Sequence, residues 1–287
     1  MSVLKPLAGI MVVLLFSAGI AWAGSQGSIE FAGLPLFLLC ACIGFLLHWV
    51  VFVPSFLFQT EHYFDLTGAL SYLATLGFAY AAHPEMQARG ILLSLMIALW
   101  AARLGSFLFL RVKKAGQDRR FNLIKTRFFR FLFTWTLGGA WVFITMAAAL
   151  AAITTSADRG IDSFFVIGTL LWITGFTLEV LADLQKSRFR ADPANKDKFI
   201  TSGLWSRSRH PNYFGEILLW FGIAVIAIPV LAGWQLLTLI SPVFVAMLLT
   251  RISGVNLLEA SGKERWGSDP AYQHYVANTP ALIPRIA

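Results

Sequence analysis

The residues best suited to chemistry lie in the stretch 203–222, GLWSRSRHPNYFGEILLWFG, where polar side chains crowd the start of an apolar run. His210 precedes a proline and is biased towards an extended backbone, and Pro211 suits the first position of a helix. Charges are costly where a chain enters lipid, and a helix N-terminus flanked by arginines favours anions. The stretch therefore predicts a functional site, and the alternative is an interfacial helix start with snorkelling arginines. Its candidate residues are Arg207, Arg209, His210, Asn212, Tyr213 and Glu216.

A second set of polar residues follows one helical face near the end of the apolar run 163–184. Glu179, Asp183, Lys186 and Arg190 are spaced four, three and four residues apart, so they form one stripe. A stripe that begins with acids and continues outward as bases predicts one wall of a cleft open to the cytosol. Internal pairing of Asp183 with Lys186 is the alternative.

Arg103 lies inside the run 90–110, and an arginine in lipid needs a partner or a water-filled cavity. Trp100 and Phe107 share its face by their three- and four-residue spacing. The basic loop 111–130 attracts lipid headgroups whatever its function. Its centre mixes both signs of charge around a glycine, which favours a ligand loop made of Gly116, Asp118, Arg119, Arg120 and Asn122.

The segment 58–65 is a short polar connection between two apolar runs. Gln59, Glu61, Tyr63 and Asp65 offer hydrogen-bonding groups at the membrane boundary. A solvated turn is the alternative.

Composition sets the elements that must position these residues. The chain has 287 residues, of which 57% are hydrophobic and 13% charged, and its mean hydropathy is +0.68. We expect an all-α, polytopic transmembrane bundle of seven to eight spans with a C-terminal tail. The first run, which ends in Ala-Trp-Ala, also resembles a signal peptide. The expected spans are 6–23, 35–57, 66–83, 90–110, 131–153, 163–184, 212–230 and 233–251.

We expect one integral membrane domain over 1–287, in which spans within 1–57 precede a catalytic region at 58–287. Of the 23 Lys and Arg residues, 20 fall on the side of the N-terminus, which predicts that both termini and the tail are cytoplasmic. The net charge of +8 then reflects orientation, and no nucleic-acid motif is present. The histidines are dispersed, and Cys40 and Cys42 suit apolar packing, so we expect no metal. A monomer in a bacterial inner membrane is expected.

Several of these motifs together resemble the steroid 5α-reductase family (3-oxo-5α-steroid 4-dehydrogenases). They are Gly-Leu-Trp followed by Arg-His-Pro-Asn-Tyr-Phe-Gly-Glu, Glu179-x3-Asp183, Arg103-Leu-Gly and the ending Tyr275-x3-Thr279-Pro280-x-Leu-Ile-Pro284. The resemblance covers 58–287. The Arg-His-Pro-x-Tyr core also occurs in isoprenylcysteine carboxyl methyltransferases and in sterol reductases. A membrane methyltransferase that uses S-adenosylmethionine is therefore the rival interpretation, and a non-enzymatic lipid-binding protein is a third.

The resemblance implies reduction of the Δ4 bond of a 3-oxo steroid, or of another lipid enone entering from the bilayer, with hydride from NADPH to C5 and a proton to C4. It implies NADPH contacts from the polar residues of 103–122, 179–190 and 207–216 named above, and also from Arg251 and Tyr272. Glu61, Gln59 and Tyr63 would serve the carbonyl as catalytic groups, with Glu61 kept protonated by burial. Trp100, which stands where the family has a tyrosine, would line the substrate site with Asp65 and Phe107.

Overall fold

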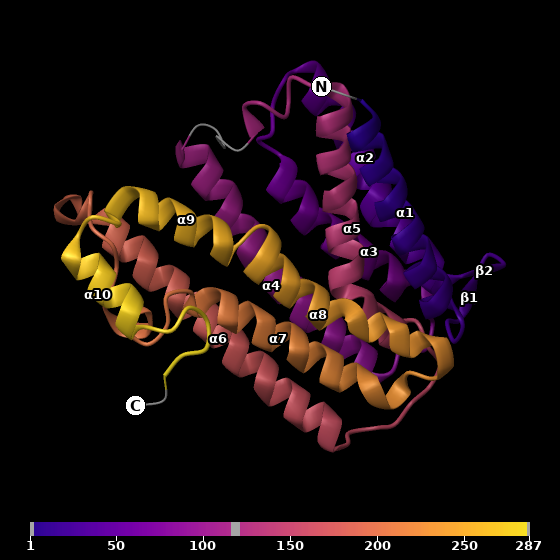
Figure 1. Ribbon diagram of the computed structural model, residues 1–287. Helices are drawn as coiled ribbons and strands as arrows, with labels where there is room; N and C mark the ends of the chain where they lie inside the picture. Colours follow the sequence, from indigo (N-terminus) through magenta and orange to yellow (C-terminus); the bar gives the residue numbers. More distant parts are fainter. Residues whose placement is uncertain (1–2, 116–120, 286–287) are drawn as a thin grey trace. The chain divides into compact units, whose positions relative to one another are not determined.

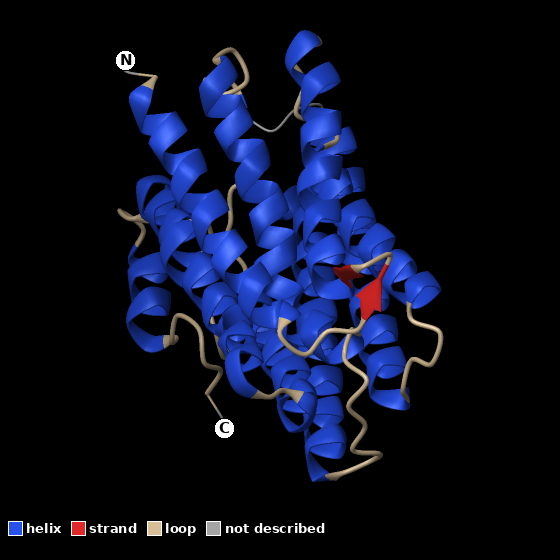
Figure 2. Ribbon diagram, turned by 90° about the vertical axis from the view of Figure 1, so that its right-hand side faces the viewer, coloured by secondary structure: helices blue, strands red, loops and turns tan. Residues whose placement is uncertain are grey.

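The computed structural model describes residues 3–115 and 121–285. Helices make up most of it, and the strands form one small hairpin (Figure 2). The chain divides into two compact units, Met1–Asp162 with Ile226–Ser241, and Ser163–Val225 with Pro242–Ala287. The expectation of an all-α helical bundle is confirmed.

The first unit is organised around α5, which is almost wholly buried in its second half. The run 147–152 in α5 is all alanine except for Leu150, and side chains this small let neighbouring helices approach closely. The helices α1, α2, α3 and α4 all pack against α5 (Figure 1). Their bounds are α1 (Leu4–Ser25), α2 (Leu36–Leu57), α3 (Phe64–Ala82), α4 (Ala88–Ala115) and α5 (Phe128–Ile153).

Short elements complete the first unit. The strands β1 (Glu30–Phe31) and β2 (Leu34–Pro35) pair antiparallel through a turn in which Ala32 and Gly33 both have positive φ. The 3₁₀ helices η4 (Ile228–Val230) and η5 (Gly233–Leu239) come from the late part of the chain, and η5 packs on α1 and α5.

A buried arginine ties three segments of the first unit together. Arg89, at the start of α4, is 2% exposed. Its Nη1 donates to the carbonyl of Ile226 at 2.5 Å, and its Nη2 donates to the carbonyl of Gly160 at 3.0 Å. Nη2 also lies 3.0 Å from Asp162 Oδ2. Asp162 therefore compensates the buried charge, and the two carbonyls accept hydrogen bonds from Nη1 and Nη2.

The second unit contains α6 (Ser163–Ala191), most of α7 (Pro211–Ala227) and most of α8 (Ile240–Met247). After α8 come a π-helix η6 (Leu248–Ile252), α9 (Val255–Trp266) and α10 (Pro270–Asn278). Two 3₁₀ turns, η2 (Pro193–Asn195) and η3 (Gly203–Ser206), lie between α6 and α7.

Seven helices are long and apolar enough to cross a membrane, among the residues described. The protein is therefore an integral membrane protein, whereas the orientation of its termini and the bacterial inner membrane stay predictions. The expected span at 66–83 is a helix, α3, but it is not among the seven. The expected span at 233–251 begins as the 3₁₀ helix η5 instead of an α-helix. Pro242 has no N–H to donate and is tolerated in the first helical turn, which suits a start of α8 at Ile240.

Candidate functional site

Two glycines bring α6 and α7 into backbone contact within the second unit. A Cβ added to Gly175 would lie 2.5 Å from the carbonyl oxygen of Gly215, and one added to Gly215 would lie 2.6 Å from the amide of Glu179. Carbon atoms do not approach this closely, so only glycine fits at either position. This contact sets the polar residues of α6 beside those at the start of α7.

Three carboxylates are buried on these two helices. Glu179 is 2% exposed, Asp183 7% and Glu216 9%. The Asn212 side chain, in the first turn of α7, donates from Nδ2 to Asp183 Oδ1 at 3.1 Å. We call Glu179, Asp183, Asn212 and Glu216 the acidic cluster. Apart from His210, its three acids are the buried charged or titratable side chains of the second unit as far as the structure describes it.

A second set of contacts surrounds the residue before α7. His210 Nε2 lies 2.7 Å from Glu259 Oε1. Arg209 reaches the same carboxylate twice, from Nε to Oε1 at 3.1 Å and from Nη2 to Oε2 at 3.0 Å. The Tyr213 ring stacks on the imidazole with centroids 5.8 Å apart and planes 10° apart. Glu259 of α9 therefore fixes both basic residues of the Arg-His-Pro motif.

The same motif holds the C-terminal tail. Arg209 Nη1 donates to the carbonyls of Val276 at 2.6 Å and Thr279 at 3.0 Å, and its backbone N–H donates to Pro280. The Ser208 hydroxyl donates to the carbonyl of Leu282 at 2.7 Å. The tail therefore packs back onto residues 207–209. Arg209 thus has a structural task that spacing alone could not reveal.

Aromatic side chains connect α6, α10 and the segment that joins α6 to α7. The indole of Trp205 donates to the carbonyl of Ala182 at 3.1 Å, and Lys186 Nζ lies 4.4 Å from its ring centroid. Tyr275 donates its hydroxyl to the carbonyl of Trp205 at 2.6 Å. Burial raises the pKa of Tyr275 above its ordinary range, and burial raises the pKa of Tyr272 in the same direction.

The other predicted cofactor residues are more scattered. Arg190, Arg207 and Arg251 are exposed, and Arg251 lies in the π-helix η6. Arg103 lies on α4 in the first unit, with its guanidinium carbon 5.4 Å from the ring centroid of Phe107. Asn122 is exposed. Gly116, Asp118, Arg119 and Arg120 lie outside the described residues.

The predicted catalytic residues lie in the first unit, at the turn between α2 and α3. Glu61 is buried and its Oε2 lies 2.7 Å from Lys125 Nζ. A lysine at this distance favours the ionised carboxylate, which opposes the neutral acid that the reductase role needs. Gln59 is exposed, with φ +52°, and donates its side-chain amide to the carbonyl of Phe56 at 2.6 Å. Tyr63 is also exposed, so the structure does not bring these three side chains into one pocket.

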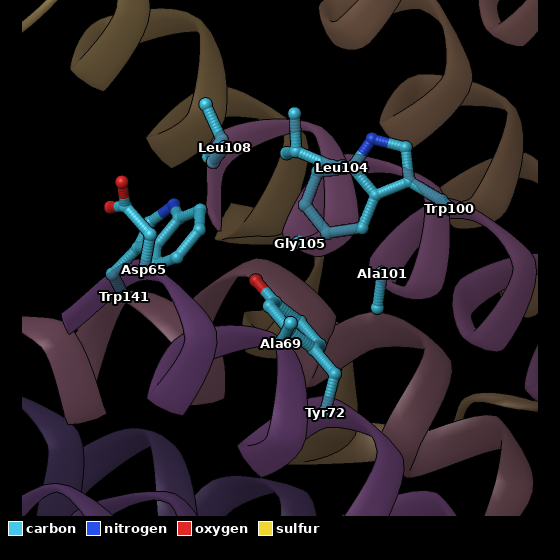
Figure 3. A pocket seen from close by; sticks show the side chains of 9 residues that line it. All are labelled: Asp65, Ala69, Tyr72, Trp100, Ala101, Leu104, Gly105, Leu108 and Trp141. Atoms are coloured by element: carbon cyan, nitrogen blue, oxygen red, sulfur yellow. The ribbon is translucent and has the colours of Figure 1, made fainter. Parts of the chain in front are cut away.

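Two of the three predicted substrate residues do meet at a small cavity in the first unit. Asp65 and Trp100 line it together with Tyr72 and Trp141, and Figure 3 shows these side chains around the cavity. Phe107 is not part of its lining. The space is about 10 Å³, which suits one water molecule and is far below the volume of a typical ligand site. Sequence reasoning missed Tyr72, whose ring packs edge-on against Trp100 at 5.4 Å.

A larger hollow of about 680 Å³ lies in the second unit beside α10. Its lining mixes acid, base, amide and aromatic groups, including Lys198, Phe199, Asp269, His274 and Asn278. Ligand sites have this size, but no single chemistry stands out in its walls. No group of three or more possible metal ligands occurs in 3–115 or 121–285, and the expectation of no metal stays a prediction.

Residues 51–279 match the model of a family described as "Protein of unknown function (DUF1295)". A curated relative, "Probable O-methyltransferase ustE" of Ustilaginoidea virens, is 26% identical over 106 residues. That match covers 32% of this chain and 37% of the relative, so the chain spans about a third of the relative's length. A comparison with solved structures found no match.

These matches correct two expectations. The matching family is distinct from the steroid 5α-reductases, and the curated relative is named a methyltransferase, so the predicted membership and the predicted steroid reductase activity are wrong. The geometry explains why the motif misled. Arg209 and His210 hold the tail and Glu259, a structural task that suits bundles of different chemistry. NADPH was implied by that same resemblance, and its binding stays a prediction that the titration below tests.

Proposed function

This chain belongs to the DUF1295 family, and from that premise we propose that it is a membrane-embedded methyltransferase. It uses S-adenosylmethionine and methylates an oxygen of a lipophilic acceptor, in the manner of the isoprenylcysteine carboxyl methyltransferases. The curated relative supports the proposal, because it carries the name of a probable O-methyltransferase. The Arg-His-Pro-x-Tyr motif is compatible with this class but does not select it.

The gathering of three buried carboxylates on α6 and α7 is the observation that carries the proposal. The buried acids Glu179, Asp183 and Glu216 lie on two helices in backbone contact. Carboxylates attract cations and repel anions, and the effect strengthens as water is excluded. S-adenosylmethionine carries positive charge on its sulfonium and its ammonium, whereas NADPH carries three phosphate groups. The acidic cluster therefore suits the first ligand better than the second.

The residues present fit such a ligand in distinct roles. Asp183 and Glu216 would face its positive groups, and Asn212, already bonded to Asp183 at 3.1 Å, would hold that carboxylate in one orientation. When bound, S-adenosylmethionine supplies an electrophilic methyl group. The buried setting of the acids also limits access of water, which would otherwise compete as methyl acceptor.

Ligand-dependent thermal unfolding of the detergent-purified protein tests the proposal. S-adenosylmethionine at a hundred times its dissociation constant should add roughly 2.7 kcal/mol to stability. S-adenosylhomocysteine, which lacks the sulfonium charge, should bind more weakly. Asp183→Asn should reduce the difference in affinity between S-adenosylmethionine and S-adenosylhomocysteine, because it removes the negative charge while the side chain keeps nearly the same size. Asp197→Asn is the matched control, since Asp197 is an exposed acid paired with Arg265. Stabilisation by NADPH and not by S-adenosylmethionine would overturn the proposal.

A further inference from the structure

The two ring nitrogens of His210 are in different situations. Nε2 lies 2.7 Å from Glu259 Oε1. Nδ1 is buried and has no hydrogen-bond partner among the residues that the structure describes. The whole residue is only 5% exposed. A buried nitrogen without a partner is uncommon and destabilising, so its presence needs a reason.

Glu259 decides which nitrogen carries the proton. A carboxylate oxygen only accepts hydrogen bonds, so the close contact with Nε2 places the imidazole proton there. Nδ1 then presents a lone pair. The stacked Tyr213 ring and the two bonds from Arg209 to Glu259 fix the imidazole and its carboxylate in one arrangement. His210 is thus a preset proton acceptor oriented by a carboxylate.

The place of His210 in the chain connects it with the acidic cluster. His210 immediately precedes Pro211, the first residue of α7, and Asn212 bonds Asp183 from the first turn of that helix. The proton acceptor and Asn212, which orients Asp183, therefore belong to one helix start.

We propose that Nδ1 of His210 is the general base of the methyl transfer and that the acceptor is a hydroxyl compound, a lipophilic phenol or alcohol. This inference rests on the proposed function. In the step, a lone pair of the hydroxyl oxygen forms the new O–CH₃ bond, and the S–CH₃ bond breaks with its electron pair left on sulfur. The hydroxyl proton passes to Nδ1, and Glu259 stabilises the imidazolium that forms.

The pairing of His210 with Glu259 distinguishes between two classes of oxygen acceptor, carboxylic acids and hydroxyl compounds. A carboxylic acid is already ionised at neutral pH, so its methylation releases no proton and needs no base. A hydroxyl group keeps its proton at neutral pH and must lose it when the oxygen is methylated. The binding of the C-terminal tail accounts for the contacts of Arg209 and of His210 Nε2, but it does not account for the unpartnered Nδ1. A hydroxyl acceptor, which must lose a proton, gives Nδ1 a role.

The variant His210→Gln removes the proposed general base but keeps a hydrogen-bond donor to Glu259. A glutamine amide can donate to Glu259 much as Nε2 does, but it has no basic nitrogen at the place of Nδ1. Methyl-labelled S-adenosylmethionine is supplied with 4-dodecylphenol, 1-dodecanol or dodecanoic acid, and label in the lipid fraction is measured. Wild type should label a hydroxyl probe, and His210→Gln should lower that rate by roughly 10²–10⁴-fold with donor binding unchanged. His274→Asn, which removes an exposed histidine of α10, should behave as wild type.

A spectroscopic measurement tests the orientation without turnover. Side-chain ¹⁵N spectra of ¹⁵N-histidine-labelled protein, assigned by loss of one signal in His210→Gln, should show Nε2 protonated and Nδ1 bare. Glu259→Gln should give a mixture of tautomers, because a neutral amide can donate as well as accept. A wild-type spectrum with the proton on Nδ1 would contradict the inference.

The remaining outcomes separate this inference from the proposed function. Failure of the protein to bind S-adenosylmethionine removes the proposed function and this inference with it. Three other outcomes leave donor binding intact and overturn only the general base and the acceptor class. They are label only in dodecanoic acid, label in none of the three probes, and equal rates in wild type and His210→Gln.

Discussion

The backbone contact between α6 and α7 makes Gly215→Ala a sharp test of how the acidic cluster is held. The added methyl would lie 2.6 Å from both the Glu179 amide and the Gly175 carbonyl. Ordinary contacts begin near 3.4 Å, so the helices must separate by roughly 0.8 Å at this point. Overpacking of this kind typically costs about 1–3 kcal/mol, only partly offset by the better helix propensity of alanine.

The same separation has a functional consequence. The Asn212–Asp183 hydrogen bond is 3.1 Å long, and an increase of roughly 0.8 Å would take it beyond hydrogen-bonding distance. We therefore expect Gly215→Ala to lower the apparent melting temperature by several degrees and to weaken binding of S-adenosylmethionine.

Gly77→Ala is the matched control, because a Cβ at this α3 position meets nothing within 4 Å. Alanine there should leave stability unchanged or raise it slightly. Thermal unfolding of both variants in one detergent, with and without the donor, makes the measurement. Equal melting of Gly215→Ala and wild type would refute the claim that the helices are in backbone contact.

Two further predictions concern single side-chain contacts. Lys125→Met should lower stability by up to about 3 kcal/mol, because the buried Glu61 loses its ion pair with Lys125. Adding Glu61→Gln to this variant should recover most of the lost stability. Equal melting temperatures of the single and double variants would contradict this prediction. Tyr275→Phe removes the hydrogen bond to Trp205 and should lower stability by about 1 kcal/mol. Because burial raises the pKa of Tyr275 above 10.0, the protonated phenol contributes stability that is fully present below pH 10 and lost as pH rises through the folded-state pKa. Tyrosinate absorbance and circular dichroism, followed together above pH 10, should show ionisation coupled to unfolding in wild type, with a smaller coupled amplitude in Tyr275→Phe.

The sequence predicted the helices, and its candidate residues include both partners of one polar contact of the site. Each span is a local pattern, since an apolar run of sufficient length marks a helix that can enter a membrane. The contact between Asp183 and Asn212 also has a local basis. Both lie near the same end of consecutive antiparallel spans, where side chains close to a shared boundary come together.

The contacts that sequence could not supply join distant segments. Glu259 lies 49 residues from His210, and Lys125 lies 64 residues from Glu61. No periodicity relates such positions, because folding of the intervening chain alone brings them together. The family assignment failed for a related reason. A short motif predicts only the local structure that it forms. Here that structure is the start of α7, which is hydrogen-bonded to the C-terminal tail.

The contacts of Arg89 also bear on the order in which the nascent chain matures. Gly160 is made 71 residues after Arg89, and Ile226, whose carbonyl accepts from Nη1, is made 137 residues after Arg89. At ~5–20 residues per second the guanidinium waits roughly 7–27 s for the Ile226 acceptor. During this interval the early helices hold a cation whose final setting is incomplete, so the first unit reaches its mature form only after much of the second has been synthesised.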